Sequence, residues 1–254
     1  MTLEGKKGVV FGVANHRSIA WAIAKAANDA GAELAITYQS ERLVDNAKKL
    51  ANELKGKRSF QCDLNNDQDI TSVREYLAKE FGKIDFIAHC VAYAPKEDLA
   101  GRFVDTSRNG FKLAMETSVY SFVAAAKGLE PILTDNASLI TLTYLGSERV
   151  MKNYNVMGVA KAALEASMRY MAYDLGPKGI RVNALSPGPI NTLAARGVSG
   201  FTKILSTVEE HAPLKRNVEQ EDIGNTAVFF FSDAARNISG EVLYIDAGYK
   251  IVGV

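Results

Sequence analysis

The sequence predicts an α/β fold: a single Rossmann-type domain with a doubly wound parallel sheet of about seven strands and helices on both faces. Short apolar runs typical of buried parallel strands alternate with helical segments along almost the whole chain. Such alternation builds right-handed βαβ units. The 254 residues could also form two small domains, but no linker, repeat or low-complexity segment divides them, so one domain over residues 1–254 is expected.

The elements follow one another in a regular order. The first helix starts near Ser18, a residue favoured at helix N-termini, and ends at Gly31. The expected strands are residues 8–12, 33–38, 60–63, 84–90, 138–143, 180–186 and 241–246. The further expected helices are residues 41–54, 67–81, 107–133, 154–175 and 223–231.

One segment, residues 191–212, breaks the alternation. It contains Gly197 and Gly200 and directly follows the Pro187-Gly-Pro189 turn after the sixth strand. In a doubly wound sheet the carboxyl ends of the strands border the ligand crevice. We therefore predict that this long irregular insertion is a substrate-binding lid; the alternative is a surface loop without a role.

Composition excludes several classes of protein. With 47% hydrophobic residues, 23% charged residues and a net charge of +1, the chain has neither the basic excess of a nucleic-acid-binding protein nor the acidity of a disordered one. No signal-peptide core precedes the first strand and no apolar run could span a bilayer, so a cytoplasmic location is expected. Cys62 and Cys90 lack CxxC spacing and the three histidines are scattered, so reduced thiols and no metal site are expected.

The candidate catalytic residues are Tyr144, Tyr154 and Lys161. If Tyr154 begins a helix, Lys161 lies seven residues further, almost two turns along the same face. A phenol beside an ammonium suits acid–base chemistry at a carbonyl, because the ammonium favours phenolate character and a tyrosine so tuned can hydrogen-bond a developing oxyanion. The alternative is structural: Lys161, Glu165 and Arg169 are spaced as an ordinary ion-pair ladder, and the tyrosines could be packing residues.

The loop from Gly12 to Ala20 is the candidate site for a dinucleotide pyrophosphate. It joins the first strand to the first helix, where free backbone N–H groups and the helix dipole favour an anion. It is not a G-x-G-x-x-G motif, since Gly12 is its only glycine, and a plain strand–helix turn is equally consistent with it. Gln39 ends the second strand, where a ribose-reading residue is expected. Asp63 ends the third strand and either accepts from an adenine amino group or caps the following turn.

Together these residues resemble the short-chain dehydrogenase/reductase superfamily, and most of all its divergent branch, the NADH-dependent enoyl-acyl-carrier-protein reductases of bacterial fatty-acid synthesis. The resemblance covers essentially the whole chain. The segments that carry it are Gly12-Val-Ala…Ser18-Ile-Ala20, Thr37-Tyr-Gln39, Asp98-Leu-Ala-Gly-Arg-Phe103, Thr143-Tyr-Leu-Gly146, Tyr154-Asn-Val-Met-Gly-Val-Ala-Lys161 and Gly188-Pro-Ile-Asn-Thr-Leu193.

Two departures from the general superfamily pattern point to this branch. Ordinary members place a tyrosine four residues before the lysine, where this chain has Met157, and their catalytic serine would fall near Tyr144. A third departure concerns Cys90-Val-Ala92, where the branch more commonly has a serine and a glycine. Ala92 adds a methyl group close to the expected position of the nicotinamide ribose.

The resemblance implies roles for individual residues. Tyr154 would hydrogen-bond the thioester carbonyl with Tyr144 as its partner, and Lys161 would hold the nicotinamide ribose. The residues expected to bind NADH are Gly12, Ser18, Ile19, Gln39, Asp63, Leu64, Val91, Lys161, Ile190, Asn191, Thr192, Leu193 and Ala194. Those expected to bind substrate are Ala94, Tyr144, Tyr154, Met157, Ala194 and Phe201.

The same resemblance implies the partners and the reaction. The expected activity is reduction of the 2,3 double bond of trans-2-enoyl thioesters on an acyl carrier protein, with NADH, by a homotetramer. Lys203, Lys215 and Arg216 are candidates for contacting the acidic carrier protein, unless they are simply solvated. Two rival functions are an ordinary carbonyl or alcohol oxidoreductase, which the missing tyrosine at Met157 disfavours, and an inactive NAD(H)-sensing protein, which retention of both tyrosines and Lys161 disfavours.

Overall fold

The computed structural model describes residues 1–192 and 200–253, and it places the strands in one seven-stranded parallel sheet. The strands are β1 (Lys7–Phe11), β2 (Glu33–Tyr38), β3 (Arg58–Gln61), β4 (Ile84–His89), β5 (Leu133–Leu142), β6 (Arg181–Pro187) and β7 (Val242–Ile245). Their order in the sheet is β3-β2-β1-β4-β5-β6-β7. Because β1 pairs with β2 on one side and β4 on the other, the winding reverses between β1 and β4, which is where α/β sheets bind ligands.

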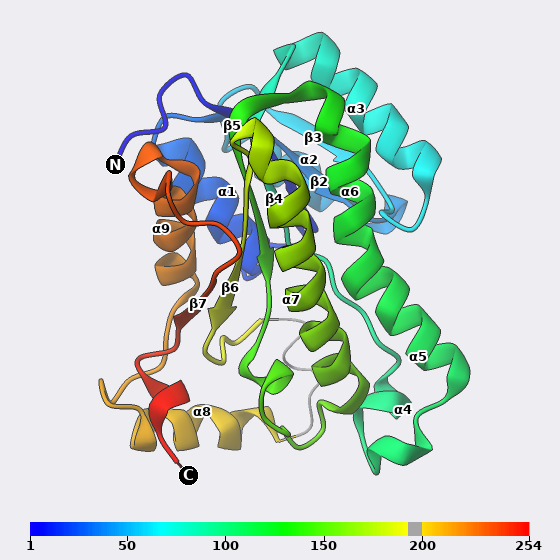
Figure 1. Cartoon of the computed structure of the whole chain (residues 1–254), viewed down its shortest axis with the longest axis vertical. Coiled ribbons are helices and arrows are strands. Elements are labelled where there is room, and N and C mark those ends of the chain that lie inside the picture. Colours follow the sequence, from blue (N-terminus) through cyan, green and yellow to red (C-terminus); the bar gives the residue numbers. More distant parts are fainter. Residues whose placement is uncertain (193–199, 254) are drawn as a thin grey trace.

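Helices cover both faces of this sheet, as predicted (Figure 1). Side chains such as Val9 and Ile87 pack on one face, beneath α3, α6 and α7. Their neighbours Val10 and Phe86 point to the other face, beneath α1, α2 and α9. The helices are α1 (Ile19–Asp29), α2 (Val44–Ala51), α3 (Asp67–Phe81), α4 (Lys96–Leu99), α5 (Arg108–Met115), α6 (Ser121–Leu129), α7 (Asn155–Leu175), α8 (Phe201–His211) and α9 (Gln220–Phe231).

The start of α1 follows the prediction closely. The hydroxyl of Ser18 accepts a hydrogen bond from the backbone N–H of Trp21, as an N-cap residue does. At the other end Gly31 has φ +107°, a conformation that favours glycine. The chain can therefore leave the helix and enter β2 within a few residues.

Some boundaries differ from the predicted ones. β3 ends two residues early, at Gln61. Cys62 N–H still donates to the carbonyl of Tyr38, and a turn follows in which the carbonyl of Asp63 accepts from Asn66 N–H. β5 starts at Leu133, five residues early, because Leu133 pairs with Ile84 before an irregularity in the ladder. α4 was not predicted at all.

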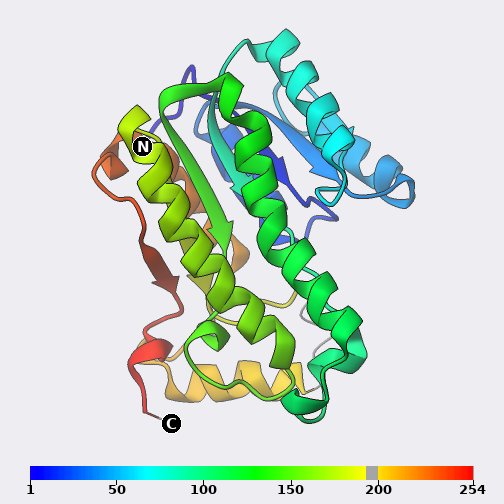
Figure 2. The same cartoon turned by 45° about the vertical axis from the view of Figure 1, so that its right-hand side comes forward.

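The prediction of an irregular insertion over residues 191–212 is partly wrong. Residues 201–211 form the helix α8, which lies at the end of the molecule where α7 begins (Figures 1 and 2). Its residue Val208 is buried in a small apolar cluster with Ala212 and Ala247. Residues 193–199 of the predicted lid lie outside the described residues.

The helix α7 carries the candidate catalytic lysine and runs for 21 residues beside α5 and α6 (Figure 2). Its buried positions recur with helical spacing and include Val156, Ala160, Leu164 and Met168. None of the helices in residues 1–192 and 200–253 is long and apolar enough to cross a membrane.

Candidate active site

A cavity of about 510 Å³ opens at the carboxyl ends of the central strands. Its walls come from the segments that follow β4, β5 and β6, from the first turns of α7, and from α8. The sequence-predicted residues that line it are Ile19, Ala94, Tyr144, Tyr154, Met157, Lys161, Ile190, Thr192 and Phe201. The structure therefore brings together most of the residues predicted to bind substrate. It also places beside them Lys161, predicted to hold the nicotinamide ribose, and the predicted cofactor-binding residues Ile190 and Thr192.

The two candidate tyrosines pack against each other in the wall of this cavity. Tyr144 follows β5 and Tyr154 directly precedes α7, and their ring centroids are 5.1 Å apart with an interplanar angle of 70°. Two glycines allow this approach. A Cβ atom on Gly146 would lie 2.5 Å from Cδ1 of Tyr154, and one on Gly158 would lie 2.7 Å from the carbonyl oxygen of Gly146.

Both phenols are held in their protonated form. Burial raises the pKa of Tyr154 well above its ordinary value, and the neighbouring Tyr144 and Glu165 raise it further. Burial and the nearby Tyr249 raise the pKa of Tyr144 to about 12. The expectation that an ammonium gives Tyr154 phenolate character is therefore wrong for this structure, because the cost of burying a charged phenolate dominates.

Lys161 lies on α7, almost two turns after Tyr154, and only 6% of its surface is exposed. Its ammonium donates a hydrogen bond of 2.7 Å to the carbonyl of Leu142, at the end of β5. Burial lowers the pKa of Lys161 to about 8, while Cys90 and Glu165 act in the opposite direction. Lys161 is therefore still predominantly an ammonium at neutral pH.

The alternative of an ion-pair ladder on α7 is wrong. Lys161 and Glu165 are both described, yet no ion pair within 4.0 Å joins them, and Arg169 is exposed. Instead, the carboxylate of Glu165 accepts from the hydroxyl of Thr143 at 2.5 Å. The side chains of this face point into the protein, toward the end of β5, and not along the helix surface.

The loop between β1 and α1 has the shape of an anion cradle. Gly12 has φ +88°, and a Cβ atom there would lie 2.5 Å from the carbonyl oxygen of Cys90. A glycine is therefore required where β1 and β4 separate at the switch point. The side chain of Asn46 donates to the carbonyl of Ala14, and Gln220 donates to that of His16. These bonds attach the loop to α2 and α9, in front of the N-terminus of α1, a position that suits a pyrophosphate.

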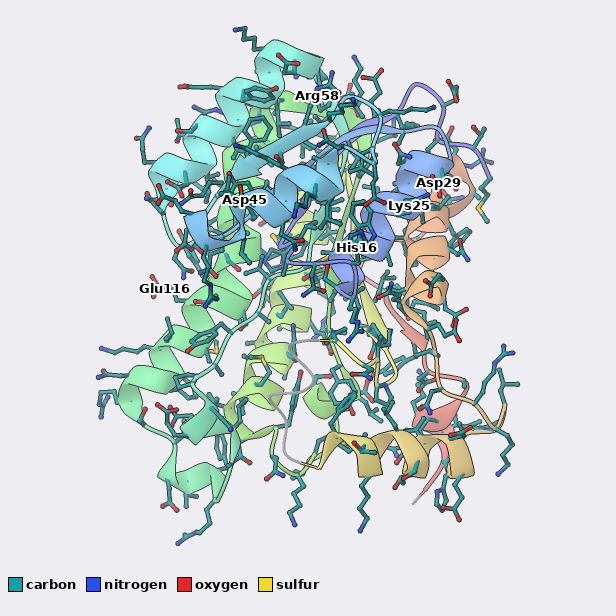
Figure 3. The ribbon with its side chains drawn as sticks, turned by 180° about the vertical axis from the view of Figure 1, so that it is seen from behind. His16, Lys25, Asp29, Asp45, Arg58 and Glu116 are labelled. Carbon is teal, nitrogen blue, oxygen red and sulfur yellow. The ribbon has the colours of Figure 1, made fainter. Side chains whose placement is uncertain are left out.

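His16 stands at the outer side of this loop (Figure 3). Its Nε2 lies 2.9 Å from a carboxylate oxygen of Glu53, and its ring meets Trp21 edge to face with centroids 5.5 Å apart. Figure 3 also shows Lys25 and Asp29 further along α1, where they form an ion pair. The two contacts of His16 attach the outer side of the loop to α1 and to the segment after α2.

The predicted adenosine end lies at the tips of β2 and β3. Gln39 is exposed directly after β2, and Leu64 is buried beyond β3. Asp63 accepts from the backbone N–H of Asn65 at 3.1 Å, so its capping role is confirmed, while its role at adenine stays a prediction. Arg42, three residues after Gln39, is exposed.

The predicted nicotinamide end lies partly within the described residues. The backbone N–H of Thr192 donates to the carbonyl of Ile190 at 2.7 Å, which forms a tight turn after β6. Val91 is half-buried after β4, and Asn191 is exposed. Leu193 and Ala194, predicted to bind cofactor and substrate, lie outside the described residues.

Sequence reasoning missed several residues of the cavity wall. These lie at the ends of β5 and β6, in the segments after β4 and β6, on α4 or before α7, and are Tyr93, Lys96, Leu99, Leu142, Thr143, Met151, Lys152, Pro187, Gly188 and Pro189, together with Ile204 on α8. Ala92, which was expected near the nicotinamide ribose, also lines the cavity. The rule that ligands lie beyond the carboxyl ends of the strands would have found those after β4 and β6. In the described part of the chain no group of three or more His, Cys, Asp or Glu side chains could hold a metal ion.

Comparison with known proteins connects this geometry to one family. A family model described as enoyl-(acyl carrier protein) reductase matches residues 12–250. The NADH-dependent enoyl-acyl-carrier-protein reductase FabI of Bacillus cereus is 53% identical over 253 residues, which are 99% of each chain. The corresponding protein of Bacillus subtilis is 50% identical over 252 residues, 98% of each chain.

Comparison with solved structures points to the same family. The crystal structure of the Bacillus cereus enoyl-acyl-carrier-protein reductase with NADP+ and indole naphthyridinone has a TM-score of 0.98 and 52% identity, covering 100% of both chains. The Anaplasma phagocytophilum reductase in complex with NAD has a TM-score of 0.96 and 46% identity, covering 100% of this chain and 97% of that one.

Proposed function

The chain belongs to the enoyl-(acyl-carrier-protein) reductase family, and from this premise we propose how its residues carry out the reaction. The protein is an NADH-dependent enoyl-acyl-carrier-protein reductase: it reduces the 2,3 double bond of a trans-2-enoyl thioester, in the last step of fatty-acid elongation. One observation carries the assignment of its site. Two tyrosines and a buried lysine border one cavity, and Met157 occupies the position where ordinary superfamily members have their tyrosine.

The residues at the carboxyl ends of the strands fit NADH. A Cβ atom at Gly12 would collide with the Cys90 carbonyl, so only glycine lets the chain turn there toward the N-terminus of α1 and its free N–H groups. Lys161 is the one ammonium buried beside the expected ribose position among the described residues. Bound NADH would supply a hydride to the β-carbon of the substrate. Gln39 would lie by the adenosine ribose, Asp63 and Leu64 by adenine, and residues 190–194 by the carboxamide.

Tyr154 stabilises the oxyanion that forms on the thioester oxygen. As hydride reaches the β-carbon, negative charge collects on that oxygen as an enolate. The phenol of Tyr154 keeps its proton because it is buried, so it can donate a hydrogen bond at that moment. Tyr144, which packs edge to face against it, is its partner, and the Lys161 ammonium adds positive potential. Uptake of a proton from solvent at the α-carbon would then complete the reduction.

The acyl chain would lie against the apolar wall of the cavity. Ala94, Met157 and Phe201 all line it. Because α8 contributes both Phe201 and Ile204, we propose that this helix covers the bound acyl group. Ala194 remains a proposed contact.

The carrier protein would dock near α8. Lys203 is exposed on this helix, and Lys215 and Arg216 are exposed in the segment that follows it. An acidic carrier would be attracted to this group of cations. The alternative is that all three cations are simply solvated. The Lys215 ammonium donates a hydrogen bond to the carbonyl of Glu210 at 2.6 Å.

We also propose a homotetramer in the cytoplasm. Tyr170 and Tyr173 on α7 are 76% and 83% exposed, and Leu243 is exposed on the edge strand β7. Large apolar side chains left exposed on a helix and on a sheet edge suit contacts between subunits.

An activity assay separates this function from its rivals. NADH oxidation is followed with crotonyl thioester and, in parallel, with a panel of ketones. Turnover with the thioester alone is expected. Turnover with ketones alone would identify a carbonyl oxidoreductase, and NADH binding without either turnover would identify a sensing protein.

A further inference from the structure

The helix α7 contains a buried carboxylate that the proposed chemistry does not use. Glu165 lies one turn after Lys161 and is only 6% exposed. Burying a carboxylate is costly unless hydrogen bonds or an opposite charge compensate it. Its surroundings therefore indicate what it does.

Glu165 and Lys161 hold two consecutive residues at the end of β5. Glu165 accepts the hydrogen bond from the Thr143 hydroxyl at 2.5 Å, and Lys161 donates to the Leu142 carbonyl at 2.7 Å. The backbone N–H of Thr143 in turn donates to the carbonyl of Leu185 at 2.8 Å, which ties this strand end to β6. The next residue is Tyr144, so these bonds set where it stands relative to α7.

Among the described residues, Glu165 is also the anionic counter-charge that raises the pKa of Lys161. Cys90 acts on Lys161 in the same direction, and Lys161 in turn lowers the pKa of His89; both of these groups lie at the end of β4. Burial raises the pKa of Cys90 to about 12 and lowers that of His89 to about 3, so both are neutral at physiological pH. Tyr154 and Tyr244 face Glu165, and burial raises the pKa of each, so they are neutral too.

We propose that Glu165, clamped to the Thr143 hydroxyl, is a positioning residue: it keeps Lys161 an ammonium and fixes α7 against the strand end that carries Tyr144. This inference rests on the proposed function for the roles of Lys161 and Tyr144. It assigns no contact between Glu165 and either substrate or cofactor.

The test is the pH dependence of NADH binding to Glu165→Gln, measured by fluorescence titration. Glutamine keeps the shape and the acceptor oxygen but removes the charge. With the pKa of Lys161 starting at about 8, a fall of about one unit reduces the ammonium fraction at pH 8 from about a half to about a tenth. The Kd of NADH should therefore rise about fivefold at pH 8 and stay within about twofold of the wild type at pH 6.

A pair of Thr143 variants tests the hydrogen bond between Thr143 and Glu165. Thr143→Val removes the hydroxyl at nearly constant shape, and Thr143→Ser keeps it. We expect Thr143→Val to lower kcat for crotonyl thioester more than it raises KM, and Thr143→Ser to restore kcat. This pair also serves if Glu165→Gln does not fold. The matched control is Asp174→Asn, which removes an exposed carboxylate from the same helix and should leave the pH profile of NADH binding unchanged.

The possible outcomes are distinct. A pH profile of Glu165→Gln that coincides with the wild type, with or without a lower Tm, would overturn the proposal, and so would equal kcat values in the two Thr143 variants. NADH binding needs no enoyl thioester. A shifted profile in a protein that does not reduce crotonyl thioester would therefore support the inference while the proposed function fails.

Discussion

Replacing Gly146 with alanine should displace the Tyr154 phenol, which we propose as the oxyanion donor, without touching the substrate. The added Cβ would lie 2.5 Å from Cδ1 and 2.8 Å from Cε1 of Tyr154, and 3.3 Å from Cδ1 of Tyr144. Carbon atoms in ordinary contact are at least about 3.5 Å apart, so the Tyr154 ring must move by roughly 1 Å. A misplacement of about 1 Å costs about 10²-fold in rate, and we expect that loss in kcat.

The assay separates displacement from unfolding. kcat and KM are measured with crotonyl thioester, the Kd of NADH by fluorescence, and stability by thermal unfolding. Overpacking costs about 1–3 kcal/mol, so Tm should fall while NADH still binds. Gly176→Ala is the control, because a Cβ there meets no atom within 4 Å and φ is −54°. If Gly146→Ala kept kcat within about twofold of the wild type, the position of the Tyr154 ring would not limit the reaction and this reasoning would be refuted.

Further substitutions test the other roles. Tyr154→Phe should keep NADH binding and lose about 10²-fold or more in kcat, because one oxyanion donor is removed; unchanged turnover would exclude Tyr154 as that donor. Lys161→Ala should weaken NADH binding more than Tyr154→Phe does, and a normal fluorescence titration would contradict its role at the ribose. Gln39→Arg combined with Ser40→Lys should narrow the preference for NADH in kcat/KM, because the cations would face a 2′-phosphate; equal use of NADPH by the wild type would show that Gln39 does not set the choice. Hydrogen exchange in α8 should slow when NADH and an acyl analogue are both bound, and slow exchange that ligands do not alter would count against its covering role.

The preference for NADH over NADPH is a sharp test because the solved structures of two relatives contain different dinucleotides. The Bacillus cereus structure holds NADP+, whereas the Anaplasma phagocytophilum structure holds NAD. In this chain the tip of β2 offers the neutral side chains of Gln39 and Ser40, followed by Glu41. Arg42 is the nearest cation in sequence, and it is exposed.

The elements most reliably predicted from sequence were those with strong local patterns. The helix after Ser18 begins where its N-cap predicts, and the long helix α7 begins within one residue of the predicted start. By contrast, the start of β5 was misplaced by five residues, because Leu133 is a strand residue only through its pairing with Ile84. The helix α8 was missed, since its amphipathic stretch is short and follows two glycines.

Local chemistry in the sequence determined the fold class, the positions of Tyr154 and Lys161 on one side of a helix, and the glycine at the turn after β1. These features follow from the hydrophobic periodicity of helices and strands and from turn residues, whose effects extend over only a few residues along the chain. Only the tertiary structure decided that Tyr144 meets Tyr154 edge to face, that Lys161 donates to Leu142 and not to Glu165, and that both phenols stay protonated. The reason is physical: contacts between β5 and α7 and the cost of burying charge depend on which segments pack together, and no local pattern records that.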